Sequence, residues 1–180
     1  MELLAFGDTG WGDELFIATL MTIAVSITAM IIGFFFALIF TPLKLSKNKF
    51  LNFIGNSYTT LIRGVPELLV IYLFFFGGTG AVMYVASIFG YNEYIEINAF
   101  ITGAFAIGII SGAYSTEVFR GAIQSIDKGQ FEAAKTLGLN KFSQFFKIIL
   151  PQTLRLAIPN LSNVWQITLK DTSLISVTGL

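Results

Sequence analysis

Residues 15–43 read LFIATLMTIAVSITAMIIGFFFALIFTPL, which is 29 consecutive residues without a charge. Roughly 20 apolar residues are enough for a helix to cross the hydrocarbon core of a bilayer. The whole chain has the same character, with 54% hydrophobic residues, 12% charged residues and a mean hydropathy of +0.74, whereas soluble domains carry about 25% charged residues. The sequence therefore predicts a membrane protein. The segment before residue 15 contains no Lys or Arg, unlike a signal peptide, so we expect a retained first span.

Further apolar stretches predict one all-α, polytopic helical bundle, a single membrane domain over residues 1–180. The predicted spans cover about residues 15–41, 52–76, 97–119 and 152–174. The second is interrupted by a helix break at Pro66 and is expected to end at Gly77 and Gly78. The third is rich in small residues that permit close helix packing in lipid: Gly103, Ala104, Ala106, Gly108, Gly112 and Ala113. The polar end at 172–180 is expected to lead into a fifth span that these 180 residues lack.

Charge in the connections predicts the orientation, because Lys and Arg are retained on the cytoplasmic side of a membrane. Two connections are basic and are expected in the cytoplasm; they carry Lys44, Lys47, Lys49, Arg120, Lys128, Lys135, Lys141, Lys147 and Arg155. The N-terminal segment and the connection 77–96 are acidic and contain Glu2, Asp8, Asp13, Glu14, Glu93 and Glu96. We therefore expect the N-terminus outside.

The composition excludes several functions. The chain has no Cys and no His, so thiol nucleophiles, His-based metal sites and the usual general base are absent from it. No Gly-rich phosphate loop followed by Lys and Ser or Thr is present, and the net charge of zero offers no nucleic-acid surface. We expect no catalytic site, no metal and no cofactor.

The connection between the third and fourth spans is far longer than two neighbouring helices need. Residues 132–138 predict a short helix ended by Gly138. A second short helix is expected to follow, with an apolar face formed by Phe142, Phe145, Phe146 and Ile149. The segment about 129–151 is therefore expected to do more than connect two spans.

Within this connection, one set of residues resembles the EAA loop of ABC importer permeases: Glu132, Ala133, Ala134, Gly138, Ile148, Leu150 and Pro151. The resemblance implies a type-1 transmembrane domain, about residues 15–180, whose short helix docks on a cytoplasmic ATPase subunit. Segments 63–69, 112–122 and 169–174 are similar to the polar amino acid uptake group. This implies a permease subunit of the bacterial inner membrane, with alternating access driven by two ATPase subunits. A second permease subunit, the same or related, and a solute-binding protein would complete the importer of a polar amino acid.

Ionisable and polar residues inside the spans are costly and mark candidate transport paths or ion pairs. Arg63 and Glu67 are four residues apart, so they predict either an ion pair on one helix face or a substrate contact. Glu117 directly follows the uncharged part of the third span, so we expect its carboxylate to be hydrated at the cytoplasmic interface, with a place in the transport path as the alternative. The fourth span concentrates polarity that predicts a pathway lining: Asn160, Asn163, Gln166, Lys170 and Asp171. Lys170 could contact a substrate carboxylate or pair with Asp171 or with an acid on another subunit. Two alternatives remain open: an ATP-independent carrier or channel, and a membrane enzyme or scaffold.

Overall fold

The computed structural model describes residues 5–7, 10–91 and 98–176, and every regular element in these ranges is a helix. Some predicted features lie outside the described residues: Glu2, Asp8, Glu93, Glu96, residue 97 and residues 177–180.

The first helix, α1 (Gly12–Leu45), contains the whole uncharged stretch 15–43. Asp13 and Glu14 lie in its first turn, where carboxylates interact favourably with the positive end of the helix dipole. Much of its surface is both apolar and exposed, for example Phe35 (63%) and Leu38 (65%). Such a surface is stable when lipid covers it.

The predicted second span, 52–76, is divided in the structure at the predicted break. The chain forms α2 (Lys49–Gly64), which ends at the extended residue Val65, and then α3 (Glu67–Tyr72). The break predicted at Pro66 is present: the ring of a proline disfavours helical geometry in the residue before it. α2 packs on α1 and α5.

Gly77 and Gly78 do not end a helix, as had been expected. α3 continues through a π-helical turn, η2 (Leu73–Gly77), into α4 (Gly78–Ile88). The amide of Gly78 donates to the carbonyls of Phe74 and Phe75. In lipid an unpaired backbone group costs several kcal/mol, so a helix that preserves its hydrogen bonds through both glycines is favoured.

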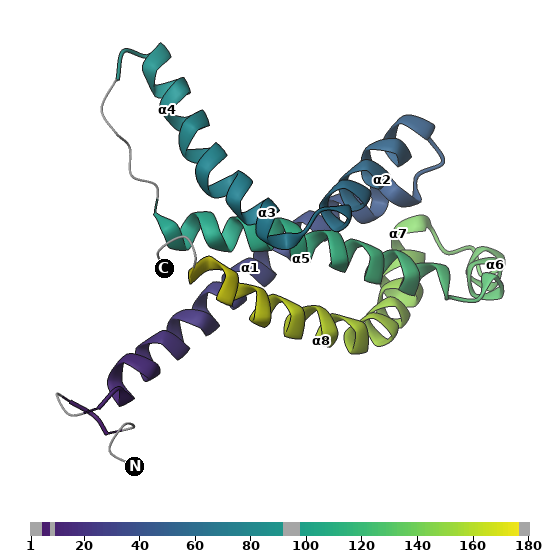
Figure 1. Ribbon diagram of the computed structural model, residues 1–180. Coiled ribbons are helices and arrows are strands. Elements are labelled where there is room, and N and C mark those ends of the chain that lie inside the picture. Colours follow the sequence, from purple (N-terminus) through teal and green to yellow (C-terminus); the bar gives the residue numbers. More distant parts are fainter. Residues whose placement is uncertain (1–4, 8–9, 92–97, 177–180) are drawn as a thin grey trace.

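α5 (Ala99–Gln124) is the central helix, and Figure 1 shows it crossing the molecule between α1, α3 and α8. Its N-cap is Asn98, whose side chain accepts a hydrogen bond from the amide of Ile101 at 3.2 Å. The predicted close packing of its small residues is confirmed. A Cβ added to Gly108 would lie 2.6 Å from Ile32 of α1, and one added to Gly103 would lie 2.6 Å from Ile175.

The long connection forms α6 (Lys128–Thr136), α7 (Lys141–Gln144) and a second π-helical turn, η3 (Phe145–Ile149). η3 continues without interruption into α8 (Leu150–Ile175), although the fourth span had been expected to begin near Pro151. A proline inside a membrane helix is tolerated where a local π-helical adjustment satisfies the backbone groups that it frees, and η3 directly precedes Pro151. Pro151 therefore does not divide the two segments.

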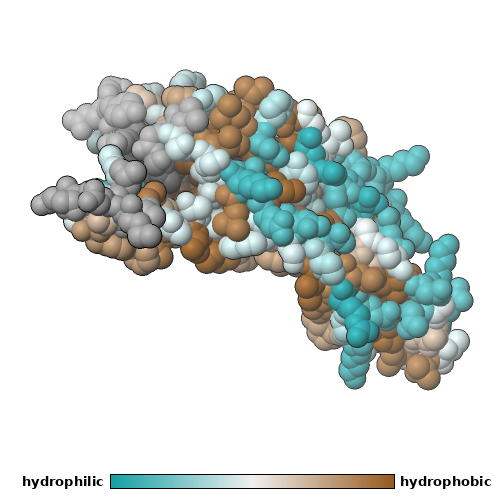
Figure 2. All heavy atoms as spheres, turned by 60° about the horizontal axis from the view of Figure 1, so that its bottom comes forward, coloured by the Kyte–Doolittle hydropathy of each residue, from teal (hydrophilic) through white to brown (hydrophobic). Residues whose placement is uncertain are grey.

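Three helical segments in the described part of the chain are long and apolar enough to cross a membrane: Gly12–Leu45, Glu67–Ile88 and Ala99–Gln124. α8 is long enough, but its composition is more polar. The connection between α1 and α2 lies at the same end of the molecule as α6 (Figure 1). Hydrophilic residues gather toward that end in Figure 2. The two basic connections therefore share one side, as the charge pattern predicted.

Candidate functional site

Glu117 of α5 is the centre of an ion network at the end of the bundle that carries α6. Lys44, near the end of α1, donates to its carboxylate, and Arg120 lies 2.8 Å from its second oxygen. Arg63 of α2 is 4.0 Å away. The side chains of Glu117 and Lys44 are only 17% and 11% exposed, so their charges compensate one another in a poorly solvated place.

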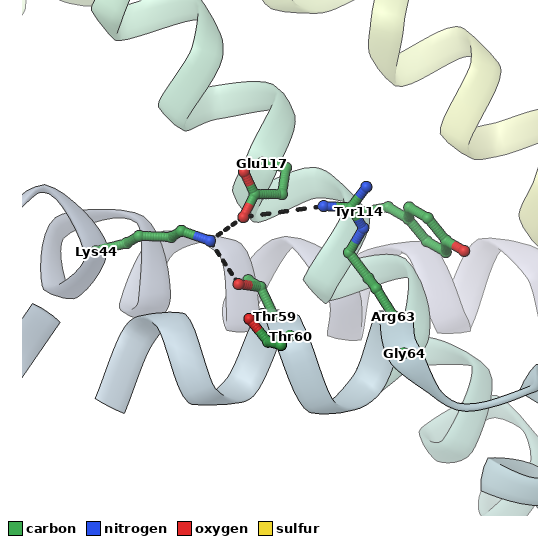
Figure 3. A pocket seen from close by; sticks show the side chains of 7 residues that line it. All are labelled: Lys44, Thr59, Thr60, Arg63, Gly64, Tyr114 and Glu117. Carbon is green, nitrogen blue, oxygen red and sulfur yellow. Dashed lines mark hydrogen bonds and ion pairs between the residues drawn. The ribbon is translucent and has the colours of Figure 1, made fainter. Parts of the chain in front are cut away.

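A pocket of about 370 Å³ opens beside this network, lined by Lys44, Thr59, Thr60, Arg63, Gly64, Tyr114 and Glu117. Lys44 also donates to Thr59 of α2 at 2.5 Å. Figure 3 shows Lys44 and Arg63 both directed toward Glu117, from two different helices. With two cations and one carboxylate on its wall, this polar pocket has an excess of positive charge suited to an anionic group.

Arg63 and Glu67 do not form the ion pair that their spacing predicted. The chain is extended at Val65, so the two residues belong to different helices. The guanidinium of Arg63 lies over the Tyr114 ring, 5.3 Å from its centroid, and it points toward Glu117. Glu67 instead accepts a hydrogen bond from the Tyr114 hydroxyl at 3.1 Å. Tyr114 thus connects the basic wall of the pocket to an acidic residue.

Asp171 is buried on the face of α8 that packs against the other helices, within electrostatic range of Glu67. Lys170 is exposed, and no ion pair joins it to Asp171 in the described residues. Tyr114 therefore has the Arg63 guanidinium over its ring and the Glu67 carboxylate at its hydroxyl, and Asp171 lies within electrostatic range of both Tyr114 and Glu67.

The remaining polar residues of α8 form an exposed face opposite its buried one. Asn160, Asn163, Gln166 and Lys170 are all exposed, whereas Val164 and Thr168 are buried. Asn160 also lines a second pocket, of about 440 Å³, together with Glu117. α8 thus presents an unpartnered polar face at the level of the membrane.

Sequence reasoning did not identify Lys44, Thr59 or Tyr114 as site residues. In the sequence, Lys44 indicates only which side of the membrane the first connection lies on, and Tyr114 only belongs to the segment 112–122 that is similar to the amino acid uptake group. The signal that could have revealed the pair is position: Lys44 follows one predicted span and Glu117 lies at the same end of another, so the two opposite charges share a similar depth.

The EAA segment folds as the sequence predicted. α6 begins at the N-cap Asp127, which accepts from the amide of Gly129 at 2.6 Å. After α6, Gly138 has φ +69°, its amide donates to the Lys135 carbonyl, and the next amide donates to Ala134. These two bonds form a Schellman cap, in which glycine is favoured because it has no Cβ. The predicted stop at Gly138 is confirmed.

Some residues of the EAA segment are exposed to solvent, and others hold the segment against the neighbouring helices. Glu132 and Ala133 are exposed, whereas Ala134 is fully buried. The segment is held to the following helices by Gln144, whose side chain donates to the Phe131 carbonyl at 3.3 Å. The other predicted members lie where η3 meets α8, with Ile148 and Leu150 half-buried and Pro151 exposed.

Residues 29–180 match the family described as binding-protein-dependent transport system inner membrane component. The nopaline transport system permease protein NocQ of Agrobacterium fabrum is 46% identical over 181 residues, covering 100% of this chain and 77% of the relative. The histidine/lysine/arginine/ornithine transport system permease protein HisQ of Escherichia coli is 37% identical, covering 95% of this chain and 75% of the relative.

A solved structure described as an amino acid ABC transporter with histidines is 32% identical, with a TM-score of 0.75 over 93% of this chain and 73% of that chain. The relatives are transport permeases and not enzymes, and they support the importer over an ATP-independent carrier. Proteins of this family work in the inner membrane with ATPase and substrate-binding partners. The chain belongs to the binding-protein-dependent transport system inner membrane components, and it is a membrane permease subunit of an ABC importer.

Proposed function

We propose that this permease carries polar amino acids or their derivatives across the membrane. The observation that carries the proposal is that Tyr114 contacts groups of both charges, with Arg63 over its ring and Glu67 at its hydroxyl. Arg63 offers a guanidinium, which binds carboxylates in a bidentate manner, and Glu67 and Asp171 offer carboxylates for an ammonium or guanidinium group. The relatives that transport nopaline or histidine, lysine, arginine and ornithine support this substrate class.

The exposed polar face of α8 supports a second permease subunit, the same or related. Asn163, Gln166 and Lys170 lie at spacings of three and four residues, so they share one helix face. Polar side chains that face lipid are costly. If this face of α8 instead met the same face of a second permease subunit, its polar side chains would line a hydrated path. We place this face at the centre of a two-permease pore, with the N-terminus outside and α6 in the cytoplasm.

The coupling mechanism follows from the continuity of α5. This helix carries Tyr114 and Glu117, and it is separated from α6 only by the short segment that contains the N-cap Asp127. When two ATPase subunits close on nucleotide, movement of their docked α6 helices would displace the end of α5. The ion network at Glu117 would then change with it, which opens the path on one side and closes it on the other.

Charge reversal on α6 tests the docking assignment. Glu132 lies on the face of α6 opposite the buried Ala134, whereas Gln130 precedes Ala134 by one turn and shares its face. We expect Glu132→Lys to abolish co-purification of the ATPase and ATP-dependent uptake of labelled arginine, since the new charge lies on the docking surface. Gln130→Lys is the matched control and should retain both.

The outcomes separate the candidate functions. If Glu132→Lys retains the complex and uptake, α6 is not the docking element. If vesicles containing the permease without ATPase subunits take up arginine along an ion gradient, the chain is an ATP-independent carrier. Gly138→Ala tests whether the end of helix α6 must keep its geometry, because alanine is strained at the φ of +69° that Gly138 adopts there.

A further inference from the structure

The pocket of about 370 Å³ between α1, α2 and α5 contains a guanidinium group whose donors are unused. The carboxylate of Glu117 already accepts hydrogen bonds from Lys44 and Arg120. Arg63 lies 4.0 Å from it, beyond hydrogen-bond distance. In the described part of the chain Arg63 makes no hydrogen bond, although its side chain is 42% exposed and lies over the Tyr114 ring. A guanidinium carries five N–H donors in one plane, so Arg63 can donate to a ligand.

Thr60 of α2 offers a second donor in the same pocket. It precedes Arg63 by three residues, so the two side chains share one face of the helix. Thr60 is exposed, and its hydroxyl makes no hydrogen bond to any described residue, whereas the exposed Thr19 donates to the carbonyl four residues earlier at 2.7 Å. Figure 3 shows Thr60 beside Thr59, on the side of α2 toward Lys44. A solute in the pocket can therefore reach both donors.

The lining of the pocket indicates a small ligand with one negative charge. Lys44 and Arg63 bring two positive charges and Glu117 one negative charge, so a monoanion neutralises the wall. Among the described residues that line the pocket there is no Leu, Ile, Val, Phe or Met, and the acyl chain of a phospholipid would have nothing to pack against. A carboxylate has two oxygens, which accept from a guanidinium and a hydroxyl at the same time.

The pocket lies on the α6 side of Tyr114. Glu117 follows Tyr114 by about one turn, toward the end of α5 that leads to α6, and Lys44 is near the end of α1. Glu67 and Asp171 do not line the pocket. A solute that leaves the middle of the bundle toward the cytoplasm therefore meets this pocket after it has passed Tyr114.

We propose that this pocket is an exit subsite for the transported amino acid, in which Arg63 and Thr60 hold the α-carboxylate on the cytoplasmic side of Tyr114. The ring of Tyr114 supports the guanidinium from one face, and the hydroxyl of Thr60 donates to the second carboxylate oxygen. This inference rests on the proposed function and adds a second position of the substrate along the path.

Binding of two ligands to the complete permease and ATPase complex tests the proposal. The complex is placed in nanodiscs without nucleotide and without the solute-binding protein, so that only the permease recognises the ligand. Arginine and argininamide compete for bound radiolabelled arginine. Argininamide has the same side chain and ammonium group but an uncharged carboxamide, so we expect the wild type to prefer arginine roughly tenfold.

Three variants define the carboxylate contacts. Thr60→Val keeps the shape but removes the donor, and it should weaken arginine binding roughly tenfold and argininamide binding less, because hydrogen bonds to charged groups are stronger. Thr60→Ser should restore the preference for arginine, and Arg63→Gln should abolish it. Thr19→Val is the matched control, with the same substitution at an exposed threonine that does not line the pocket, and it should bind both ligands as the wild type does.

A single cysteine reports on the position of the subsite. Gly64 lines the pocket and a Cβ there meets nothing within 4 Å, so Gly64→Cys fits without displacing a neighbour. In inside-out membrane vesicles, arginine should slow the reaction of this thiol with an impermeant maleimide, and the same concentration of argininamide should slow it less. Lys47→Cys, on the same side but not in the lining, should react at one rate throughout.

Equal weakening of arginine and argininamide binding in Thr60→Val and Arg63→Gln would overturn the proposal, as would protection of Gly64→Cys by inorganic phosphate as strong as that by arginine, which would indicate a general anion site. Size-exclusion chromatography confirms that each variant still forms the complex. Uptake of labelled arginine by the wild type is measured separately. Its absence would overturn the proposed function, whereas normal uptake combined with equal weakening would overturn the exit subsite alone.

Discussion

At the scale of single residues, Glu117 determines how three cations are placed. Its carboxylate contacts Lys44 and Arg120 and lies 4.0 Å from Arg63. Breaking a poorly solvated ion pair by removing one partner costs about 3 kcal/mol, because the other charge remains without compensation. We expect Glu117→Gln to lower the free energy of unfolding of the purified permease by about that amount.

Arg120→Gln provides the control for Glu117→Gln. The Arg120 side chain is 32% exposed, and exposed pairs contribute less than about 1 kcal/mol, so this variant should change stability little. The free energy of unfolding of each variant is measured in detergent by monitoring the loss of helix content. In the double variant Lys44→Met with Glu117→Gln, the cost should be smaller than the sum of the two single costs. Additive costs would show that the two charges are not coupled.

The ion network also shows where sequence spacing fails. Arg63 and Glu67 have helical spacing, but Pro66 places them on two helices, so each finds a partner elsewhere. Lys44 and Glu117 are 73 positions apart. Only the packing of α1 on α5 brings them together, and spacing cannot reveal it. By contrast, Gly138 was predictable because a helix stop depends on local backbone geometry.

At the scale of elements, α1 and α5 pack closely enough that small residues are required. A Cβ on Gly112 would lie 2.7 Å from the Phe36 Cβ, 2.7 Å from the Tyr58 hydroxyl and 3.1 Å from the Gly33 carbonyl. We expect Gly112→Ala to force the two helices apart and to destabilise the protein by about 1–3 kcal/mol. A lowered midpoint of thermal unfolding in detergent would report this.

Gly121 gives the opposite expectation on the same helix. A Cβ there meets nothing within 4 Å, and alanine in a helix interior is about 0.5–1 kcal/mol better than glycine. Gly121→Ala should therefore raise the midpoint while Gly112→Ala lowers it. Equal shifts in both variants would mean that packing between α1 and α5 does not control stability.

The bounds of the second span were mispredicted for two physical reasons. Residues 52–76 are apolar enough on average to indicate one span, yet α2 carries polar residues at helical spacing, among them Asn52, Asn56 and Arg63. Averaging hydropathy over a window of residues hides this periodic pattern of polar side chains. Gly77 and Gly78 would favour the end of a helix in water. In lipid they remain helical, because every backbone N–H and C=O must find a hydrogen-bond partner within the protein. The end of α6 was predicted correctly because the glycine stop at Gly138 acts locally, whereas its start at Lys128 lies four residues before the predicted helix.

At the scale of the whole molecule, the orientation in the membrane follows from charge and from the fold together. The connection that contains Lys47 and the helix α6 that contains Gln130 lie at one end (Figure 1). The end of α4, next to Phe89, lies at the other. Since basic connections are retained in the cytoplasm, we expect residues 47 and 130 inside and residue 89 outside.

Single cysteines test this orientation in a clean background, because the chain has no cysteine of its own. Phe89 is 85% exposed and directly follows the segment Glu67–Ile88, and Lys47 and Gln130 are exposed in the connections, so all three positions lie outside the membrane-crossing segments. A membrane-impermeant maleimide applied to intact spheroplasts should label Phe89→Cys at once and should label Lys47→Cys and Gln130→Cys only after permeabilisation. The reverse pattern would place α6 outside, where no ATPase could dock, and would overturn both the orientation and the coupling mechanism. Labelling of all three positions in intact cells would instead indicate a leaky preparation, which a cytoplasmic marker enzyme detects.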